Sequence, residues 1–232
     1  MSIAQNLADI EKRITAAAEK SGRKRGDILL LAVTKTIEAE RIKEAVELGY
    51  KSLGENRVQE IMDKYDKIQG VDWHLIGHLQ TNKVKYIADK VKMIHSVDSL
   101  KLGEEISKRC ANCGRVMDVL VEVNIAGEEA KHGVPPKDAE KLAAELAKLP
   151  NLHIKGLMTV APYDPEPENN RKYFRLMRKL FVDIQAKNYD NIDMEFLSMG
   201  MTNDYETAIE EGANIVRIGT GIFGARDYTQ HH

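Results

Sequence analysis

The stretch ILLLAVTKTIEAERIKEAVELG, residues 28–49, contains two patterns in direct succession. Six aliphatic residues, Ile28 to Val33, have the length and composition of a buried strand. From Glu38 onward, charged and aliphatic residues alternate at helical spacing as far as Gly49, a residue type that commonly follows a helix. We therefore expect a strand followed by a helix. Lys35 lies just behind the apolar run, where a buried charge would be costly.

The same pair of patterns repeats along the chain. Helical patterns separate most of the β-type runs, as in TNKVKYIADK (81–90), SLKLGEEISKR, PKDAEKLAAELAKL and PENNRKYFRLMRKLFVDIQA. Eight strands alternating with helices predict an α/β fold of the (β/α)₈ or TIM barrel type, whose usual length of about 250 residues fits this chain. A doubly wound open sheet is the alternative. The expected strands are ILLLAVTK (28–35), KSLGEN (51–56), DWHLIGH (72–78), VKMIHSV (91–97), MDVLVEVN (117–124), HIKGLMTV (153–160), MEFLSMG (194–200) and NIVRIGT (214–220).

We expect residues 1–232 to form a single domain with one extra helix at the N-terminus. Ser2 can cap that helix and Gly22 can stop it. Between these residues, Ile3, Leu7, Ile10 and Ile14 make an apolar stripe at helical spacing.

Composition excludes several classes of protein. The chain has 34 Lys and Arg against 36 Asp and Glu, so its formal charge of −2 gives no field that would attract nucleic acid or an anionic membrane. No apolar run approaches the roughly 18 residues of a membrane span, and the N-terminus lacks a secretory signal, so we expect a cytoplasmic protein. Cys110 and Cys113 form a lone CxxC without further ligands at suitable spacing, so we expect reduced thiols and no metal site.

Lys35 has an unusual position for a charged residue. Leu29, Leu31, Val33 and Lys35 have the same parity, so Lys35 can point inward at the carboxyl end of the first strand, where (β/α)₈ barrels build their sites. Desolvation there favours the neutral amine, which can form an imine with an aldehyde. The alternative is a lysine whose stem packs at the rim while its ammonium reaches water.

The last two expected strands lead into turns of small residues. One turn contains Ser198 and Thr202, and the other contains Gly219, Thr220 and Gly221. In (β/α)₈ barrels these two loops commonly bind phosphate, although glycines and hydroxyls also serve ordinary turns and helix caps. Together with an inward lysine they predict a phosphorylated aldehyde as ligand, of which pyridoxal 5′-phosphate is the obvious example.

Arg217 has the same parity as Gly219 and is expected to point into the barrel, where its guanidinium needs a partner. The pyridine nitrogen of the cofactor could be that partner. Arginine keeps its proton and can only donate, so it would leave the ring unprotonated and a poorer electron sink. A structural alternative pairs Arg217 with Glu195 or Glu122.

Five motifs carry a resemblance to a known family: AVTKT (32–36), GENRVQE (54–60), WHLIGHLQTNK (73–83), LSMGMTND (197–204) and VRIGTGIFGAR (216–226). In this order, over nearly the whole chain, they resemble the YggS/PROSC family of pyridoxal phosphate homeostasis proteins. One departure is mild, because Thr202 stands where members often have Ser. His78, Asn82 and Lys83 match a motif without an assigned role, and Gln230 to His232 lie outside the five motifs.

The resemblance implies a fold-type III barrel similar to the N-terminal domain of alanine racemase. It implies pyridoxal 5′-phosphate held as an imine on Lys35, with Asn56 beside the ring and Arg217 at the ring nitrogen. Ser198, Gly219 and Thr220 would hold the phosphate. The family is associated with vitamin B6 homeostasis without an established catalytic activity, which implies no catalytic residues and makes pyridoxal-phosphate-dependent apo-enzymes possible recipients of the cofactor. Eight βα units leave no room in 232 residues for the second domain that forms the racemase dimer interface, so we expect a monomer.

Two other classes of function remain open. An amino-acid racemase or lyase needs a second base facing the first, and we expect Tyr163 and Tyr205 to face solvent rather than supply it. A phosphosugar aldolase would also use a lysine and the phosphate loops, with Lys155 as the rival imine-forming residue.

Overall fold

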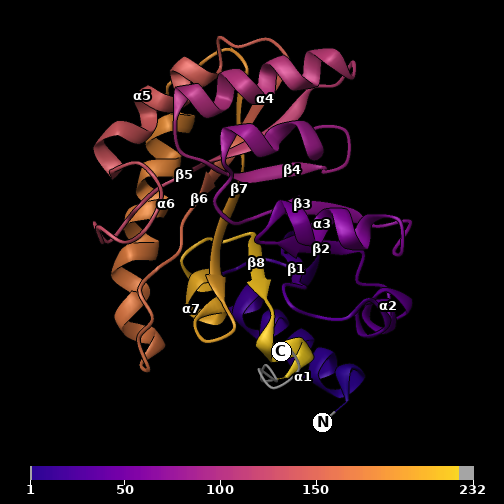
Figure 1. Cartoon of the computed structure of the whole chain (residues 1–232). Coiled ribbons are helices and arrows are strands. Elements are labelled where there is room, and N and C mark those ends of the chain that lie inside the picture. Colours follow the sequence, from indigo (N-terminus) through magenta and orange to yellow (C-terminus); the bar gives the residue numbers. More distant parts are fainter. Residues whose placement is uncertain (1, 225–232) are drawn as a thin grey trace.

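The computed structural model describes residues 2–224, and these form a closed parallel barrel in the order β1-β2-β3-β4-β5-β6-β7-β8 (Figure 1). The expectation of a (β/α)₈ barrel is confirmed, and the open sheet is excluded because β8 pairs with β1. All eight expected strands are present, with ends shifted by a few residues. They are β1 Leu29–Val33, β2 Ser52–Glu55, β3 Asp72–Leu75, β4 Met93–Val97, β5 Met117–Glu122, β6 Leu152–Met158, β7 Ile192–Met201 and β8 Ile215–Ile218.

Helices separate the strands as the alternating pattern predicts. One prediction was wrong in part: the segment 81–90, expected to form a helix, contains only the short 3₁₀ helix η2, Thr81–Tyr86. The others are α1 Ile3–Lys20, η1 Arg25–Asp27, α2 Ala39–Glu47, α3 Val58–Tyr65, α4 Leu100–Asn112, α5 Pro136–Leu146, η3 Pro167–Asn170, α6 Arg171–Gln185, α7 Tyr205–Glu210 and α8 Thr220–Phe223. None of the helices within residues 2–224 is both long and apolar enough to cross a bilayer.

The N-terminal helix begins as expected, with Ser2 and Gln5 forming a capping box. Helix α1, indigo in Figure 1, lies beside the yellow end of the chain and packs against α7 and α8. The Asn6 side chain donates a hydrogen bond of 2.8 Å to the main-chain oxygen of Ile222. The first helix therefore braces the segment that follows β8.

The two faces of each strand have different surroundings. Leu30 and Ala32 belong to the large core cluster between the sheet and the helices, whereas Leu31 is buried outside that cluster. Met93, Leu120 and Met158 form a separate small cluster. The residues that share parity with Leu31 therefore face the barrel interior, as the alternation in β1 predicts.

Candidate functional site

The site is built where the carboxyl ends of β8 and β1 meet. Ala32 is paired with Ile218, which places Gly219 directly beside Val33. A Cβ on Gly219 would lie only 3.2 Å from the main-chain oxygen of Val33, so the two strand ends are in close contact. Lys35 is half-buried and lies two residues beyond the end of β1, in a turn rather than on the strand itself.

The turn that carries Lys35 is held on both sides by helix α3. Lys64 Nζ donates a 2.8 Å hydrogen bond to the main-chain oxygen of Thr34. The backbone N–H of Thr36 donates to Glu60 Oε2 at 2.7 Å. Thr36 has a φ of 62°, a conformation that is uncommon for a residue with a branched side chain, and such strain persists only where the surroundings fix it.

Glu55, at the end of β2, completes this support. Its Oε1 accepts from Thr34 Oγ1 at 2.6 Å and from Lys64 Nζ at 2.7 Å, and its side chain is fully buried. Burial raises the pKa of Glu55 in spite of the neighbouring Lys64. Burial acts in the same direction on Glu60, but the Thr36 N–H and Lys64 outweigh it and lower the pKa of that carboxyl. The motif GENRVQE therefore supplies two carboxylates that position the lysine turn, which the sequence did not reveal.

Hydroxyl groups and backbone N–H groups meet at the mouth after β7 and β8. Thr202 Oγ1 lies 3.3 Å from Thr220 Oγ1 and accepts a 3.3 Å hydrogen bond from the N–H of Gly221. Asp204 Oδ1 accepts from the N–H of Met201 at 2.8 Å and so holds the turn that presents Thr202. This arrangement can bind an anion that reaches the mouth of the barrel.

Ser198 lies elsewhere, three residues before the end of β7 and completely buried. Arg217 NH1 donates to Ser198 Oγ at 2.7 Å, and Arg217 NH2 donates to the main-chain oxygen of Thr159 at 2.8 Å. Arg217 is 3% exposed and points into the barrel as expected. The structural alternative with Glu195 is wrong, because that carboxylate pairs with Lys155 at 2.8 Å.

Two buried histidines, His74 and His95, extend this polar row, and no motif in the sequence pointed to them. His95 Nδ1 lies 3.1 Å from Ser198 Oγ, and His95 Nε2 lies 3.0 Å from His74 Nδ1. The Ser198 hydroxyl accepts from Arg217 and can donate its own proton to His95 Nδ1, in the tautomer of His95 that carries its proton on Nε2.

Burial sets the protonation of the row. It lowers the pKa of His74 to about 4 and that of His95 well below its usual value, so both rings are neutral at pH 7. Burial also lowers the pKa of Arg217, to about 10, against the opposing charges of Asp204 and Glu122, so the guanidinium keeps its proton. The barrel interior therefore presents one positive charge beneath the mouth.

Asn56 follows β2 directly and is half-buried at the mouth. A Cβ on Gly77 would lie 2.4 Å from the main-chain oxygen of Asn56, so glycine is required there for the loops after β2 and β3 to approach. Asn56, His78, Lys83 and Tyr86 are among the residues that line a cavity of about 530 Å³. Asn82 and Lys83 lie on η2.

The residues that an aldolase or a racemase would need are poorly placed for those functions. Lys155 on β6 pairs with Glu195 at 2.8 Å and Asp193 at 3.6 Å, and the hydrogen bond with Glu195 raises the pKa of Lys155. Tyr163 is exposed as expected, but the expectation for Tyr205 was wrong. Tyr205 is buried with the Arg13 guanidinium 5.4 Å from its ring centroid, and burial raises its pKa to about 12.

Comparison with known proteins agrees with this architecture. Residues 5–227 match the family model described as alanine racemase, N-terminal domain. The fold and the match together define a class, the (β/α)₈ barrels of the alanine racemase N-terminal type, and here the barrel has a lysine just beyond its first strand.

Relatives within this class are similar over nearly their whole length. A pyridoxal phosphate homeostasis protein of Aquifex aeolicus is 47% identical over 98% of this chain and 100% of its own. The protein of that name from Escherichia coli K12 is 39% identical, with 98% of each chain covered. PipY of Synechococcus elongatus, solved with PLP bound, is 30% identical with a TM-score of 0.83, over 96% of this chain and 100% of that one. The present chain belongs to the family of pyridoxal phosphate homeostasis proteins.

Proposed function

We propose that this chain binds pyridoxal 5′-phosphate through Lys35 and takes part in vitamin B6 homeostasis and cofactor supply. The observation that carries the proposal is the contact between the end of β1 and the Gly219 turn, which brings the lysine turn next to a set of anion-binding groups. The name of the relatives and the PLP bound to PipY support the same ligand.

The residues at the mouth fit this cofactor. We assign its phosphate to Thr220, Gly219 and Thr202, because their hydroxyl and backbone groups lie at the mouth. In this assignment Ser198 does not touch the phosphate; its buried hydroxyl holds the Arg217 guanidinium in place.

The remaining contacts concern the ring of the cofactor. Arg217 would donate to the ring nitrogen, since two of its five N–H groups suffice for Ser198 and Thr159. Asn56 would lie beside the ring from the end of β2.

Bound pyridoxal phosphate supplies an electron sink and a reactive aldehyde. At the ring nitrogen Arg217 would donate a hydrogen bond and keep its proton, so that nitrogen would stay unprotonated and the sink would be weaker. A racemase also needs a second base opposite the lysine. Tyr205 is unsuited to that task, because its side chain is buried against Arg13 and its pKa is raised to about 12 by burial. We therefore propose a cofactor carrier rather than an enzyme.

The proposal includes a cytoplasmic monomer that hands the cofactor to pyridoxal-phosphate-dependent apo-enzymes. Cys110 is buried near the end of α4 and Cys113 is exposed, and the proposed cytoplasmic location would keep both thiols reduced.

Absorption spectra before and after borohydride reduction test the anchor. We expect a visible band that reduction removes and a pyridoxyl group that peptide mapping places on Lys35. Lys35→Ala should lose both, and Lys155→Ala, the matched control, should keep both. A protein that stays colourless and unlabelled with pyridoxal phosphate, or a label on Lys155, overturns the assignment.

A second measurement separates the carrier from an enzyme. The loaded protein is incubated with amino acids in deuterated water, and exchange of the Cα proton is followed by NMR. A carrier leaves the Cα proton in place, whereas exchange that depends on Lys35 would identify a racemase or lyase.

A further inference from the structure

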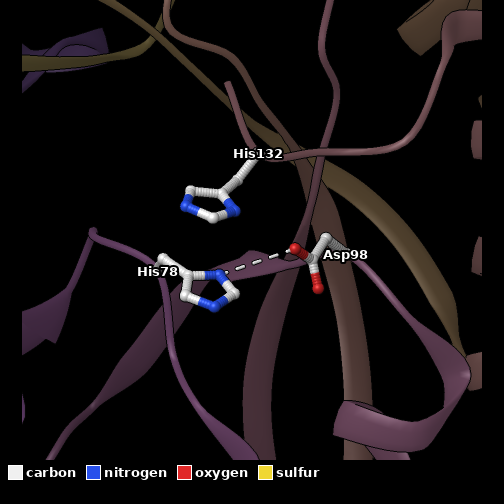
Figure 2. Close-up of side chains that lie close together, drawn as sticks. All are labelled: His78, Asp98 and His132. Atoms are coloured by element: carbon white, nitrogen blue, oxygen red, sulfur yellow. Dashed lines mark ion pairs between the residues drawn. The ribbon is translucent and has the colours of Figure 1, made fainter. Parts of the chain in front are cut away.

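Three side chains with metal-binding donor atoms converge at the mouth of the barrel, across from Lys35 and the Gly219 turn. Figure 2 shows His78, Asp98 and His132, and one nitrogen of each ring lies on the side that faces the carboxylate. One ligand atom from each residue lies within 4.8 Å of the other two, and His78 Nδ1 is 3.7 Å from Asp98 Oδ2.

The three residues come from consecutive strand ends. His78 lies in the loop after β3, Asp98 directly follows β4, and His132 lies in the loop between β5 and α5. In a closed barrel of eight strands, β3 to β5 lie across the mouth from β7, β8 and β1. The cluster is therefore separate from Lys35 and the Gly219 turn, although His78 and Asn56 line the same cavity.

The two imidazoles of the cluster lie face to face. Their centroids are 3.8 Å apart with an angle of 10° between the planes, which is a stacked pair. Each ring offers two nitrogens, and an imidazole binds a metal ion through the nitrogen that carries no proton.

We propose that His78, Asp98 and His132 form a binding site for a divalent transition-metal ion of the Zn²⁺ class. Two imidazoles and one carboxylate are a donor set that Zn²⁺ accepts with three protein ligands and one open position. This set disfavours Mg²⁺ and Ca²⁺, which prefer oxygen ligands alone. The site goes beyond the proposed binding of pyridoxal phosphate and does not depend on it.

Metal binding requires a small rearrangement that the loops allow. Ligands bound at about 2.0–2.2 Å in a tetrahedral site lie about 3.3–3.6 Å from each other. The 3.7 Å between His78 and Asp98 is already near this spacing. The stacked rings must tilt so that the ion lies in the plane of each, and both histidines are exposed on loops where such rotation meets little resistance.

Calorimetric titration with Zn²⁺ tests the site. Every sample carries His231→Ala and His232→Ala, because these terminal imidazoles, which lie outside residues 2–224, would compete for the ion. We expect one ion per chain, with affinity lowered at least about tenfold by His78→Ala, Asp98→Ala or His132→Ala. Circular dichroism confirms that each variant is folded.

Two control variants exclude other donors. His153 lies 3.5 Å from Asp118 and 2.9 Å from Asp193, so His153→Ala removes a histidine that also sits between carboxylates. Cys113→Ser removes the exposed thiol. Both controls should bind Zn²⁺ with unchanged affinity, and so should Lys35→Ala, which removes the proposed cofactor anchor.

The outcomes of the Zn²⁺ titration can be told apart from those of the experiment on cofactor attachment at Lys35. Loss of binding in the three cluster variants, with the controls intact, supports the site whether or not Lys35 carries pyridoxal phosphate. Absence of saturable Zn²⁺ binding in the folded parent, or equal affinity in folded His132→Ala, overturns it. The absorption spectrum of the Co²⁺ form gives an independent readout, because four-coordinate nitrogen and oxygen ligation gives bands that the His132→Ala variant should lose.

Discussion

Lys64 Nζ lies 2.8 Å from the main-chain oxygen of Thr34, so a side chain of α3 holds the residue that precedes Lys35. The same ammonium pairs with Glu55 at 2.7 Å and Glu60 at 3.1 Å. Lys64 therefore holds the turn that carries Lys35 and also supplies a positive charge beside two carboxylates. Its side chain is only 11% exposed.

Replacing this cation should damage both stability and cofactor attachment. Lys64→Met leaves the carboxylate of Glu55 buried without its counter-ion, and we expect the free energy of unfolding to fall by about 3 kcal/mol. Attachment of pyridoxal phosphate at Lys35 should slow, because the turn loses the bond to Thr34. Urea denaturation and the growth of the visible band measure the two effects. Lys43→Met, on the exposed face of α2, is the control, and equal behaviour of the two variants would contradict the role of Lys64.

The Thr202 hydroxyl should matter for affinity and little for stability. A hydrogen bond to a charged phosphate contributes about 1.5–3 kcal/mol, so Thr202→Ala should raise the Kd for pyridoxal phosphate about 10- to 100-fold. Thr202→Ser keeps the hydroxyl and should bind nearly as the parent does. Fluorescence titration measures the Kd, and an unchanged Kd in Thr202→Ala would remove this residue from the phosphate site.

Ser198→Ala should lower stability more than it lowers affinity for the cofactor. The substitution leaves an N–H of Arg217 and Nδ1 of His95 without their partner inside the barrel, which we expect to cost about 1–3 kcal/mol of unfolding free energy. Affinity for the cofactor should then fall less than in Thr202→Ala. A stable Ser198→Ala protein that binds the cofactor poorly would instead make Ser198 a direct phosphate ligand.

The barrel could be predicted from the sequence because its strands are buried on both faces and appear as apolar runs. The inward face could be predicted too, since Leu31 and Arg217 follow from parity alone. Short helices were harder, and over 81–90 the helical spacing did not distinguish a 3₁₀ turn from an α-helix. Tyr205 was misjudged because its burial comes from contact with α1, nearly two hundred residues earlier in the chain.

The buried polar row could not be predicted either, because its members come from strands far apart in the sequence. His74, His95 and Ser198 come from β3, β4 and β7, and no spacing within one element brings them together. The same is true of His78, Asp98 and His132, which meet only because consecutive strand ends share one mouth. The expectation of no metal site followed from the lone CxxC of Cys110 and Cys113, whereas the residues that converge are two histidines and an aspartate from three separate loops.

The buried histidine pair should make stability depend on pH. The folded pKa of His74, about 4, lies below its ordinary value of 6.5, so between these values the unfolded chain binds a proton that the folded chain does not. Stability is therefore lost as the pH falls from 6.5 to 4, by on the order of 3 kcal/mol from this residue.

His74→Asn isolates this effect, because its amide can still meet His95 without titrating. The variant should lose less unfolding free energy than the parent as the pH falls through this window. Urea denaturation at several pH values gives the comparison, in which carboxylates common to both proteins cancel. Parallel pH profiles would show that His74 does not titrate as its burial implies.

Gly219 should be intolerant of a side chain for a geometric reason. In Gly219→Ala the new Cβ would lie 3.2 Å from the oxygen and 3.3 Å from the Cβ of Val33, so the end of β1 must shift by a few tenths of an ångström. Overpacking of this kind costs about 1 kcal/mol or more, and the shift is passed to the turn that carries Lys35. We expect the Kd for pyridoxal phosphate to rise by about tenfold, with a modest fall in the urea midpoint. Gly26→Ala is the matched control, because its Cβ would meet nothing within 4 Å. If both variants bind the cofactor equally well, the contact between the two strand ends does not position the lysine.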